Sequence, residues 1–253
     1  MTNPTIELRQ VEYQIPTSST RSILSGVSLQ ICKGEMIALL GRSGSGKTTL
    51  LKLINGLRRP TSGEILVQRK NVQDWDIIRL RRSIGYVIQE VGLFPHLTVR
   101  ENVCLVPALE SWPAERIASR YADVLESVGL SPSVYSHRYP RELSGGQRQR
   151  VGVARALAAD PEILLMDEPF GALDPVTRAE LQREFLALSR KLSKTVVFVT
   201  HDVREALLLG TRIVLLDAGR IVAEAAPRDF LDLSHPVARE FLAAAELATG
   251  ARA

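Results

Sequence analysis

The segment GRSGSGKT, residues 41–48, constrains the fold of this chain more than any other part of the sequence. It follows EMIALL, 35–40, a continuous apolar run of the kind that forms a buried parallel strand. It leads into GKTTLLKLINGL, 46–57, which we interpret as a helix with Gly56 near its end. A strand, a glycine-rich loop and a helix in this order predict a phosphate-binding loop in an α/β fold.

The residue types of this loop suit a nucleotide. Glycines let the backbone approach phosphate oxygens without Cβ clashes, and the helix N-terminus supplies positive potential. The Lys47 ammonium can reach the β- and γ-phosphates, and the Thr48 hydroxyl can bind Mg²⁺. We predict a nucleotide-binding loop made of Gly41, Arg42, Ser43, Gly44, Ser45, Gly46, Lys47, Thr48 and Thr49.

An acidic pair follows another apolar run. In EILLMDEP, 162–169, the apolar residues carry Asp167 to the end of a predicted strand, where parallel sheets bind ligands. We predict that Asp167 holds Mg²⁺ through water and that Glu168 polarises the attacking water. The alternative is that the acidic pair only marks the start of a helix.

The remaining pattern indicates an α/β fold with a mainly parallel sheet. Strand patterns occur at 5–13, 26–31, 63–67, 83–89, 162–167 and 195–201, with a hairpin formed by 212–217 and 220–225 around Ala218 and Gly219. Helical patterns occur at 114–130, 145–159, 177–192 and 202–210. We expect one domain, 1–253, with an N-terminal antiparallel β subdomain and a nested helical subdomain at about 91–159.

Composition is that of an ordinary globular protein, with 45% hydrophobic and 24% charged residues. The net charge of +4 permits contact with a polyanion without demanding it, and we expect no nucleic-acid partner. Cys32 and Cys104 lie far apart in the sequence and are expected to be free thiols. We find no signal-peptide pattern and no apolar run near the ~20 residues of a membrane helix. Any spanning segment would belong to another chain.

The segment LSGGQRQR, 143–150, resembles the ABC signature. Together with the phosphate-binding loop, Gln89, the acidic pair and His201, which occur in the family's order, it makes the chain similar to an ABC ATPase over essentially its whole length. The resemblance implies an ATPase of the P-loop NTPase fold that uses ATP and Mg²⁺.

The signature also has a local rationale. Ser144, Gly145, Gly146 and Gln147 lie at a predicted helix start, where a hydroxyl and backbone N–H groups form an anion site. In the family this site serves the γ-phosphate of the ATP held by the opposite subunit. The resemblance therefore implies a homodimer, or a pair with a second ABC ATPase, with two composite sites.

Other roles are implied by position within the family's motifs. Gln89 resembles the Q-loop glutamine, which contacts Mg²⁺ or the attacking water. GALD, 171–174, resembles the D-loop, with Asp174 near the subunit interface, and His201 resembles the switch histidine that contacts the γ-phosphate. Without the motif order, Gln89 would be interpreted as a polar residue at a strand end and His201 as a structural histidine.

The adenine-stacking position departs from the family pattern. The family places an aromatic residue four positions after a valine of the first strand, and counting from Val11 gives Ile15. Tyr13 is on the same strand face but two residues early, so Tyr13 and Ile15 are both candidates. We interpret PTSSTR, 16–21, as a turn and an insertion that lengthens the segment before Gly41.

Two segments, 80–103 and 166–182, closely resemble importer ATPases for glycine betaine, choline, carnitine and other osmoprotectants. Such importers use permease subunits and a separate solute-binding protein, which implies a peripheral location on the cytoplasmic face of the inner membrane. Phe94, Pro95 and Leu97 are candidates for the permease contact, the alternative being ordinary packing. Many of these ATPases add a C-terminal CBS pair, a pattern that the sequence up to Ala253 does not show, so the resemblance does not extend to ionic-strength sensing through such domains.

Alternative functions remain. The chain could serve an importer for amino acids, sulfonates or similar solutes. A soluble ABC protein of DNA repair would carry long coiled-coil insertions, and one of translation would carry two cassettes; neither pattern is present. A P-loop kinase would have no use for a signature aimed at another subunit.

Overall fold

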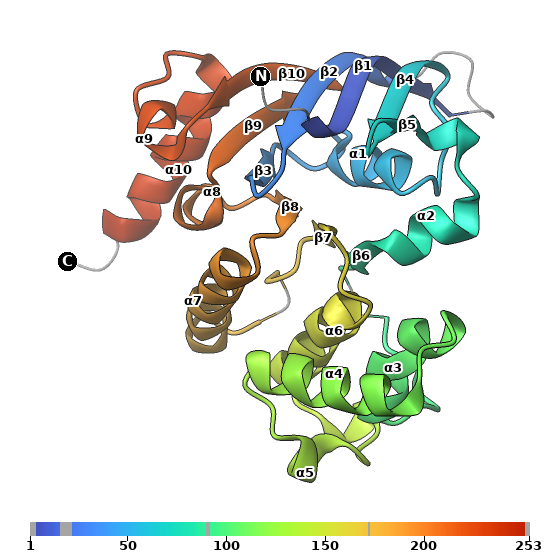
Figure 1. Ribbon diagram of the computed structural model, residues 1–253. Coiled ribbons are helices and arrows are strands. Elements are labelled where there is room, and N and C mark those ends of the chain that lie inside the picture. Colours follow the sequence, from blue (N-terminus) through green and yellow to red (C-terminus); the bar gives the residue numbers. More distant parts are fainter. Residues whose placement is uncertain (1–3, 16–21, 90–91, 172, 251–253) are drawn as a thin grey trace. The chain divides into compact units, whose positions relative to one another are not determined.

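The computed structural model describes residues 4–15, 22–89, 92–171 and 173–250 (Figure 1). The chain forms two compact units, one combining residues 1–80 with 195–253 and one made of residues 81–194. The expected turn at 16–21, the expected start of the helical subdomain at Val91, and Ala172 of the GALD segment lie outside the described residues.

The first unit contains an antiparallel sheet whose strands lie in the order β2-β1-β4-β5. Alternation of apolar and polar residues places Ile6, Leu8 and Val11 in the core, because successive side chains of a strand point to opposite faces. The expected antiparallel subdomain is thereby confirmed. Its strands are β1 (Pro4–Gln14), β2 (Ser22–Cys32), β4 (Ser62–Val67) and β5 (Lys70–Asn71).

A second set of strands in this unit is centred on β3 (Met36–Leu40). β3 pairs in parallel with β8 (Thr195–Thr200) and β9 (Arg212–Asp217), and β9 pairs antiparallel with β10 (Arg220–Ala225). Every residue of β3 and β8 is buried, which explains the apolar runs MIALL in β3 and VVFV in β8. The expected parallel strands and the C-terminal hairpin are confirmed.

Of the helices in this part of the chain, α1 and α8 were expected from the sequence, whereas η1, α2, α9 and α10 were not. Asn71 caps the short 3₁₀ helix η1, and Asp202 caps α8. The helices are α1 (Lys47–Ile54), η1 (Val72–Asp74), α8 (Val203–Leu209), α9 (Pro227–Phe230) and α10 (Pro236–Gly250), and α2 (Ile77–Ser83) runs across the boundary between the units.

The second unit has two parallel strands, β6 (Ile84–Val87) and β7 (Ile163–Asp167). In α4 the helical spacing buries Tyr121, Val124 and Leu125, and α3, α4 and α6 pack against one another. The helices are α3 (Val99–Leu109), α4 (Ala114–Ser127), α5 (Pro132–Tyr135), η2 (Pro140–Glu142), α6 (Gly145–Ala158) and α7 (Pro175–Leu192).

The helices expected for a nested subdomain lie between Val99 and Ala158, within a larger compact unit that also contains β6, β7 and α7. Within the described ranges, no helix combines the length and the apolar character needed to cross a membrane. Cys32 and Cys104 are free thiols, as predicted.

Candidate nucleotide site

The glycine-rich loop begins where β3 ends at Leu40 and leads into α1 at Lys47. A Cβ on Gly41 would lie 2.2 Å from the Leu216 carbonyl oxygen, so the fold itself requires glycine there. Gly44 has φ +78°, and a Cβ on it would meet no atom within 4 Å. The backbone at Gly44 is therefore open to a ligand, whereas Gly41 is fixed by packing.

Lys47 places its ammonium inside the loop. Its side chain is buried, and Nζ donates to the carbonyl oxygens of Gly41 at 2.7 Å and Arg42 at 2.8 Å. The Ser45 hydroxyl is also buried and has no hydrogen-bond partner in the structure. A cation and an unsatisfied hydroxyl at a helix N-terminus suit an anionic ligand such as a phosphate.

The outer part of the loop is exposed at Arg42, Ser43 and Gly44, while Thr48 and Thr49 are half-buried in the first turn of α1. Arg42 forms an ion pair with Glu240 of α10. Both side chains are more than half exposed, so this pair adds little stability. It does place the C-terminal helix next to the loop.

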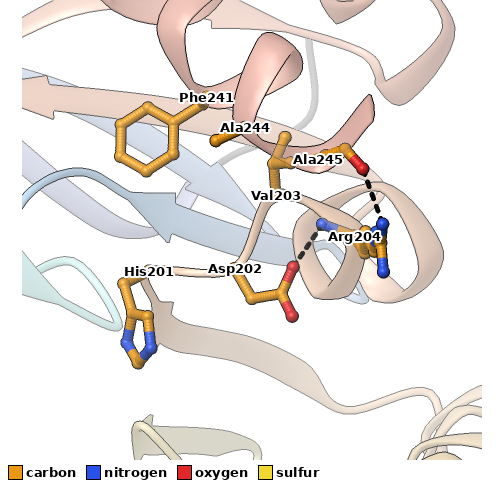
Figure 2. A pocket seen from close by; sticks show the side chains of 7 residues that line it. All are labelled: His201, Asp202, Val203, Arg204, Phe241, Ala244 and Ala245. Carbon is orange, nitrogen blue, oxygen red and sulfur yellow. Dashed lines mark hydrogen bonds between the residues drawn. The ribbon is translucent and has the colours of Figure 1, made fainter. Parts of the chain in front are cut away.

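His201 leaves the sheet beside the start of the loop. In the parallel pairing of β3 and β8, Leu40 lies opposite Thr200, so Gly41 and His201 follow at the same edge. Figure 2 shows His201 and Asp202 on one side of a pocket of about 220 Å³ and Phe241 of α10 on the other. The Asp202 carboxylate accepts from the Arg204 N–H at 2.8 Å and so caps α8. The His201 side chain itself is exposed.

Tyr13 is placed differently from what an adenine platform needs. Its side chain is 7% exposed, its hydroxyl accepts from the Arg58 guanidinium at 2.8 Å, and that guanidinium lies 5.1 Å above the ring centroid. A buried and covered ring offers little surface for stacking. The half-buried Ile15 is the better candidate of the two.

In the second unit, Gln89 and Glu168 come together because of strand register. In the pairing of β6 with β7, Val87 lies opposite Met166. Gln89 and Glu168 each follow two residues after this pair. Gln89 Nε2 donates to Glu168 Oε2 at 3.3 Å. Glu168 has φ +45°, an uncommon backbone conformation for this residue type that is often associated with functional sites.

Asp167, the last residue of β7, is 5% exposed. Burial, together with the charge of Asp167, raises the pKa of Tyr86 to about 12. In the described part of the chain, no three His, Cys, Asp or Glu side chains gather as a metal site. A Mg²⁺ ion beside Asp167 would therefore depend on hydroxyl, amide, water and phosphate oxygens, which is the usual arrangement for this ion.

The predicted anion site of the signature is built as a helix cap. Ser144 is the N-cap of α6: its Oγ accepts from the Gln147 N–H at 3.2 Å, and the Gln147 Oε1 accepts from the Ser144 N–H at 2.9 Å. Neither of these two hydrogen bonds uses the hydroxyl proton of Ser144. A Cβ on Gly145 would meet nothing within 4 Å, whereas one on Gly146 would lie 2.6 Å from the Thr177 methyl group.

Asp174 has a local role in the structure. It is the N-cap of α7, and its carboxylate accepts from the backbone N–H groups of Val176 and Thr177, each at 3.1 Å. Hydrogen bonds from Thr177 and Val176 hold the pKa of Asp174 below its usual value. Its role at a subunit interface stays a prediction.

The loop after Gln89 is held by a residue that the sequence analysis did not identify. Asn102 is fully buried; its Oδ1 accepts from the Phe94 N–H at 2.8 Å, and its Nδ2 donates to the Phe94 carbonyl at 3.1 Å and the Leu97 carbonyl at 3.0 Å. Phe94 itself is 42% exposed. An amide side chain four positions into a helix, after the capping Thr98, was the available sequence signal.

Beside this loop lies a cavity of about 320 Å³ within the second unit. Its apolar wall includes Ile88 and Phe94, and Arg81, Arg82 and Arg155 also line it. Burial lowers the pKa of Arg155, whose guanidinium donates to the Gly92 carbonyl at 2.7 Å. The cavity combines apolar surface with positive charge.

Comparison with known proteins gives consistent matches. The ABC transporter family model matches residues 24–171. A glycine betaine/carnitine/choline transport ATP-binding protein of Bacillus subtilis is 53% identical over 211 residues, covering 83% of this chain and 55% of the relative. A glycine betaine uptake system ATP-binding protein of Escherichia coli is 46% identical over 225 residues, covering 88% of this chain and 73% of the relative.

The chain spans about half the length of several of the relatives it matches, 55% of the Bacillus protein and 54% of an osmoprotectant import ATP-binding protein of Salmonella typhimurium. Among solved structures, the dimeric bacterial ABC transporter cassette MJ0796 is similar with a TM-score of 0.80 and 36% identity, covering 88% of this chain and 99% of that one. The motifs, the fold and these matches agree: the chain belongs to the ABC transporter family of ATP-binding cassettes.

Proposed function

We propose that this chain is the ATP-binding and ATP-hydrolysing subunit of an importer for an osmoprotectant such as glycine betaine or choline. The observation that carries the ATPase part is the glycine-rich loop, which holds the buried Lys47 ammonium and the unsatisfied Ser45 hydroxyl and leaves open space at Gly44. The cargo part is supported by relatives named for glycine betaine, carnitine, choline and osmoprotectant transport. We treat the two compact units as parts of one ATPase domain.

The proposed reaction transfers the γ-phosphoryl group of ATP to water. Lys47 and the loop N–H groups bind the phosphates, and Thr48, Asp167 and Gln89 would hold Mg²⁺, which neutralises phosphate charge when bound. Glu168 orients the water and takes its proton, and Gln89 keeps the Glu168 carboxylate in a fixed orientation by their hydrogen bond. The exposed side chain of His201 would contact the terminal phosphate.

The working form is proposed to be a dimer, either of this chain or with a second ABC ATPase. The cap at Ser144 and Gly145 is exposed and has open space at Gly145, which supports its use as a site for the phosphate of an ATP bound to the opposite subunit. A related cassette has been solved as a dimer in a post-hydrolysis state bound to ADP and Pi. Each ATP would then be held by the loop of one subunit and the signature of the other.

Permease subunits and a separate solute-binding protein complete the proposed importer, on the cytoplasmic face of the membrane. The cavity beside Phe94 supports a permease contact, because its apolar wall and its arginines fit a segment with apolar and acidic side chains. Pro95 and Leu97 belong to the same loop, which Asn102 holds in place.

Glu168→Gln tests the catalytic assignment. We expect ATP turnover to fall by about 10²–10⁴-fold, because the amide cannot take the proton, while ATP binding and dimer formation persist. Turnover is measured by phosphate release and dimers by light scattering. Glu115→Gln, on the exposed face of α4, is the matched control and should keep wild-type turnover. Wild-type turnover in Glu168→Gln would refute the assignment.

The cargo is tested separately with the complex reconstituted in vesicles. ATP-dependent uptake of radiolabelled glycine betaine or choline is expected. A methionine import ATP-binding protein of Carboxydothermus hydrogenoformans is also 41% identical, which favours an amino-acid importer as the second candidate. Uptake of methionine without uptake of betaine or choline would reject the osmoprotectant and leave the ATPase assignment intact.

A further inference from the structure

We propose that Tyr135 is a positioning residue of the signature anion site, acting through Gln147 on Ser144. The proposal rests on the proposed function, since it concerns the phosphate that the signature is taken to bind. Tyr135 lies outside the signature segment, at the end of α5. Its hydroxyl accepts a hydrogen bond from Gln147 Nε2 at 3.1 Å.

Gln147 uses both ends of its side-chain amide. Its Oε1 accepts from the Ser144 N–H at 2.9 Å, and its Nε2 donates to Tyr135. The opposite orientation of the amide would bring its N–H₂ group against the Ser144 N–H, where no hydrogen bond can form. The Ser144 N–H therefore sets the amide orientation, and the Tyr135 hydroxyl holds the Nε2 end of the amide in the position that completes the cap of α6.

The cap also involves the Ser144 hydroxyl. Ser144 Oγ accepts from the Gln147 N–H at 3.2 Å, so its own proton is not used in the cap and can be donated to a ligand. Ser144 and Gly145 are exposed, and the position of a Gly145 Cβ is open space. A phosphate oxygen can approach there and accept from the serine hydroxyl and the helix N–H groups.

Tyr135 is itself held by residues that do not belong to α6. Its N–H donates to the Ser131 carbonyl at 3.1 Å, and its carbonyl accepts from the Arg138 N–H at 3.1 Å. The Arg138 guanidinium lies 4.9 Å from the centroid of its ring. The Arg138 carbonyl accepts from the Val99 N–H of α3 at 2.8 Å. Tyr135 thus connects the signature cap to a segment that α3 fixes.

The consequence for binding is specific. Without the Tyr135 hydroxyl, Gln147 Nε2 loses this acceptor. The Gln147 side chain then spends less time in the conformation that caps α6. A neutral hydrogen bond of this kind corresponds to about a two- to tenfold change in an equilibrium constant. The loss should affect the step in which the signature binds phosphate. ATP binding by the Lys47 loop, which belongs to the other unit, should not change.

The test uses the full chain in the Glu168→Gln background, where ATP-bound dimers accumulate. The ATP concentration that gives half-maximal dimer is measured by sedimentation velocity with and without Tyr135→Phe, and is expected to rise about two- to tenfold. Affinity for a fluorescent ATP analogue is measured on dilute monomer and is expected to be unchanged. Tyr121→Phe, which removes a hydroxyl bonded to Ser136 at 2.8 Å in the same unit, is the control.

A double-mutant cycle separates positioning from general loosening of the unit. In a chain that already carries Gln147→Met, Tyr135→Phe should cause no further change in dimer formation, because the path through Gln147 is gone. Four results would each overturn the proposal. The first two are additive effects of Tyr135→Phe and Gln147→Met, and dimerisation of Tyr135→Phe equal to that of its parent. The others are an effect of Tyr121→Phe as large as that of Tyr135→Phe, and weaker nucleotide binding by the Tyr135→Phe monomer. Failure of the Glu168→Gln parent to dimerise with ATP would instead reject the proposed function, and this proposal with it.

Discussion

The two glycines that open α6 have different surroundings, although they are neighbours in the sequence. A methyl group on Gly146 would collide with Thr177, at 2.6 Å, while one on Gly145 would meet no atom of this chain. Neither glycine has a positive φ, so backbone strain does not explain their presence. Gly146 is explained by packing against α7, and Gly145 by the space that it leaves open for a ligand.

Gly145→Ala and Gly146→Ala should therefore differ in the property that they damage. Gly145→Ala should leave the free energy of unfolding equal or higher by up to about 1 kcal/mol, because alanine favours helix. It should weaken ATP-dependent dimerisation at least about tenfold, because the methyl group occupies the approach to the anion site. Gly146→Ala should lower the free energy of unfolding by about 1–3 kcal/mol, because Thr177 must move. Urea unfolding measures the free energy of unfolding, and sedimentation measures ATP-dependent dimerisation. If Gly145→Ala dimerised as well as the wild type, the interpretation that Gly145 leaves space for a ligand would be wrong.

At the scale of elements, α3 does more than fill the core of the helical unit. Its buried Asn102 bonds the backbone of the loop that contains Phe94 and Leu97, and its N-terminal Val99 bonds the segment that carries Tyr135. One helix thus supports both the candidate permease loop and the residue that positions the signature. These contacts are hydrogen bonds of 2.8–3.0 Å, and we expect them to keep the loop in one conformation.

Asn102→Ala tests this support. The change leaves the Phe94 N–H and the Leu97 carbonyl without their partner, so we expect the free energy of unfolding to fall by about 2–4 kcal/mol. Amide hydrogen exchange in the loop should accelerate, while the chain still binds ATP. Asn71→Ala, which removes the η1 cap bond to Gln73 at 3.0 Å, is the control and should leave exchange in the loop unchanged. Unchanged exchange at Phe94 and Leu97 in Asn102→Ala would show that other contacts hold the loop.

At the scale of the whole molecule, the two predicted phosphate sites belong to different compact units. Lys47 lies in the first unit and Ser144 in the second. A symmetric dimer would contain each site twice, and every nucleotide would need one of each kind from opposite subunits. Activity would then depend on the pairing of chains and not only on the integrity of each chain.

Mixing two inactive variants tests that dependence. Lys47→Ala removes the loop cation and Ser144→Arg blocks the signature, so each variant alone should have almost no turnover. In an equal mixture, half of the dimers are mixed and contain one intact composite site of two, which predicts roughly a quarter of wild-type turnover if sites act independently. Phosphate release measures the result. An inactive mixture, with mixed dimers shown by pull-down of a tagged chain, would contradict the composite site.

The sequence was informative wherever a pattern is local. The apolar run before Gly41, the glycines after it and the alternation in the first strands depend on neighbours within a few residues, and β1, β3 and α1 appear where they were expected. The position of Glu168 was also predictable from local sequence. It directly follows an apolar run that forms the strand β7 and so lies where that strand ends. Such features follow from steric and hydrophobic preferences that act over one element.

What the sequence alone determined is therefore the fold class, the phosphate-binding loop and the motif order that indicates the family. The tertiary structure decided the partners of individual side chains. It places the Arg58 guanidinium over the Tyr13 ring, and it forms hydrogen bonds from Gln89 to Glu168, from the Phe94 N–H to Asn102 and from Gln147 to Tyr135. The physical reason is that these pairs form through strand register and helix packing. Register and packing depend on the whole fold, so periodicity within a single element does not reveal them.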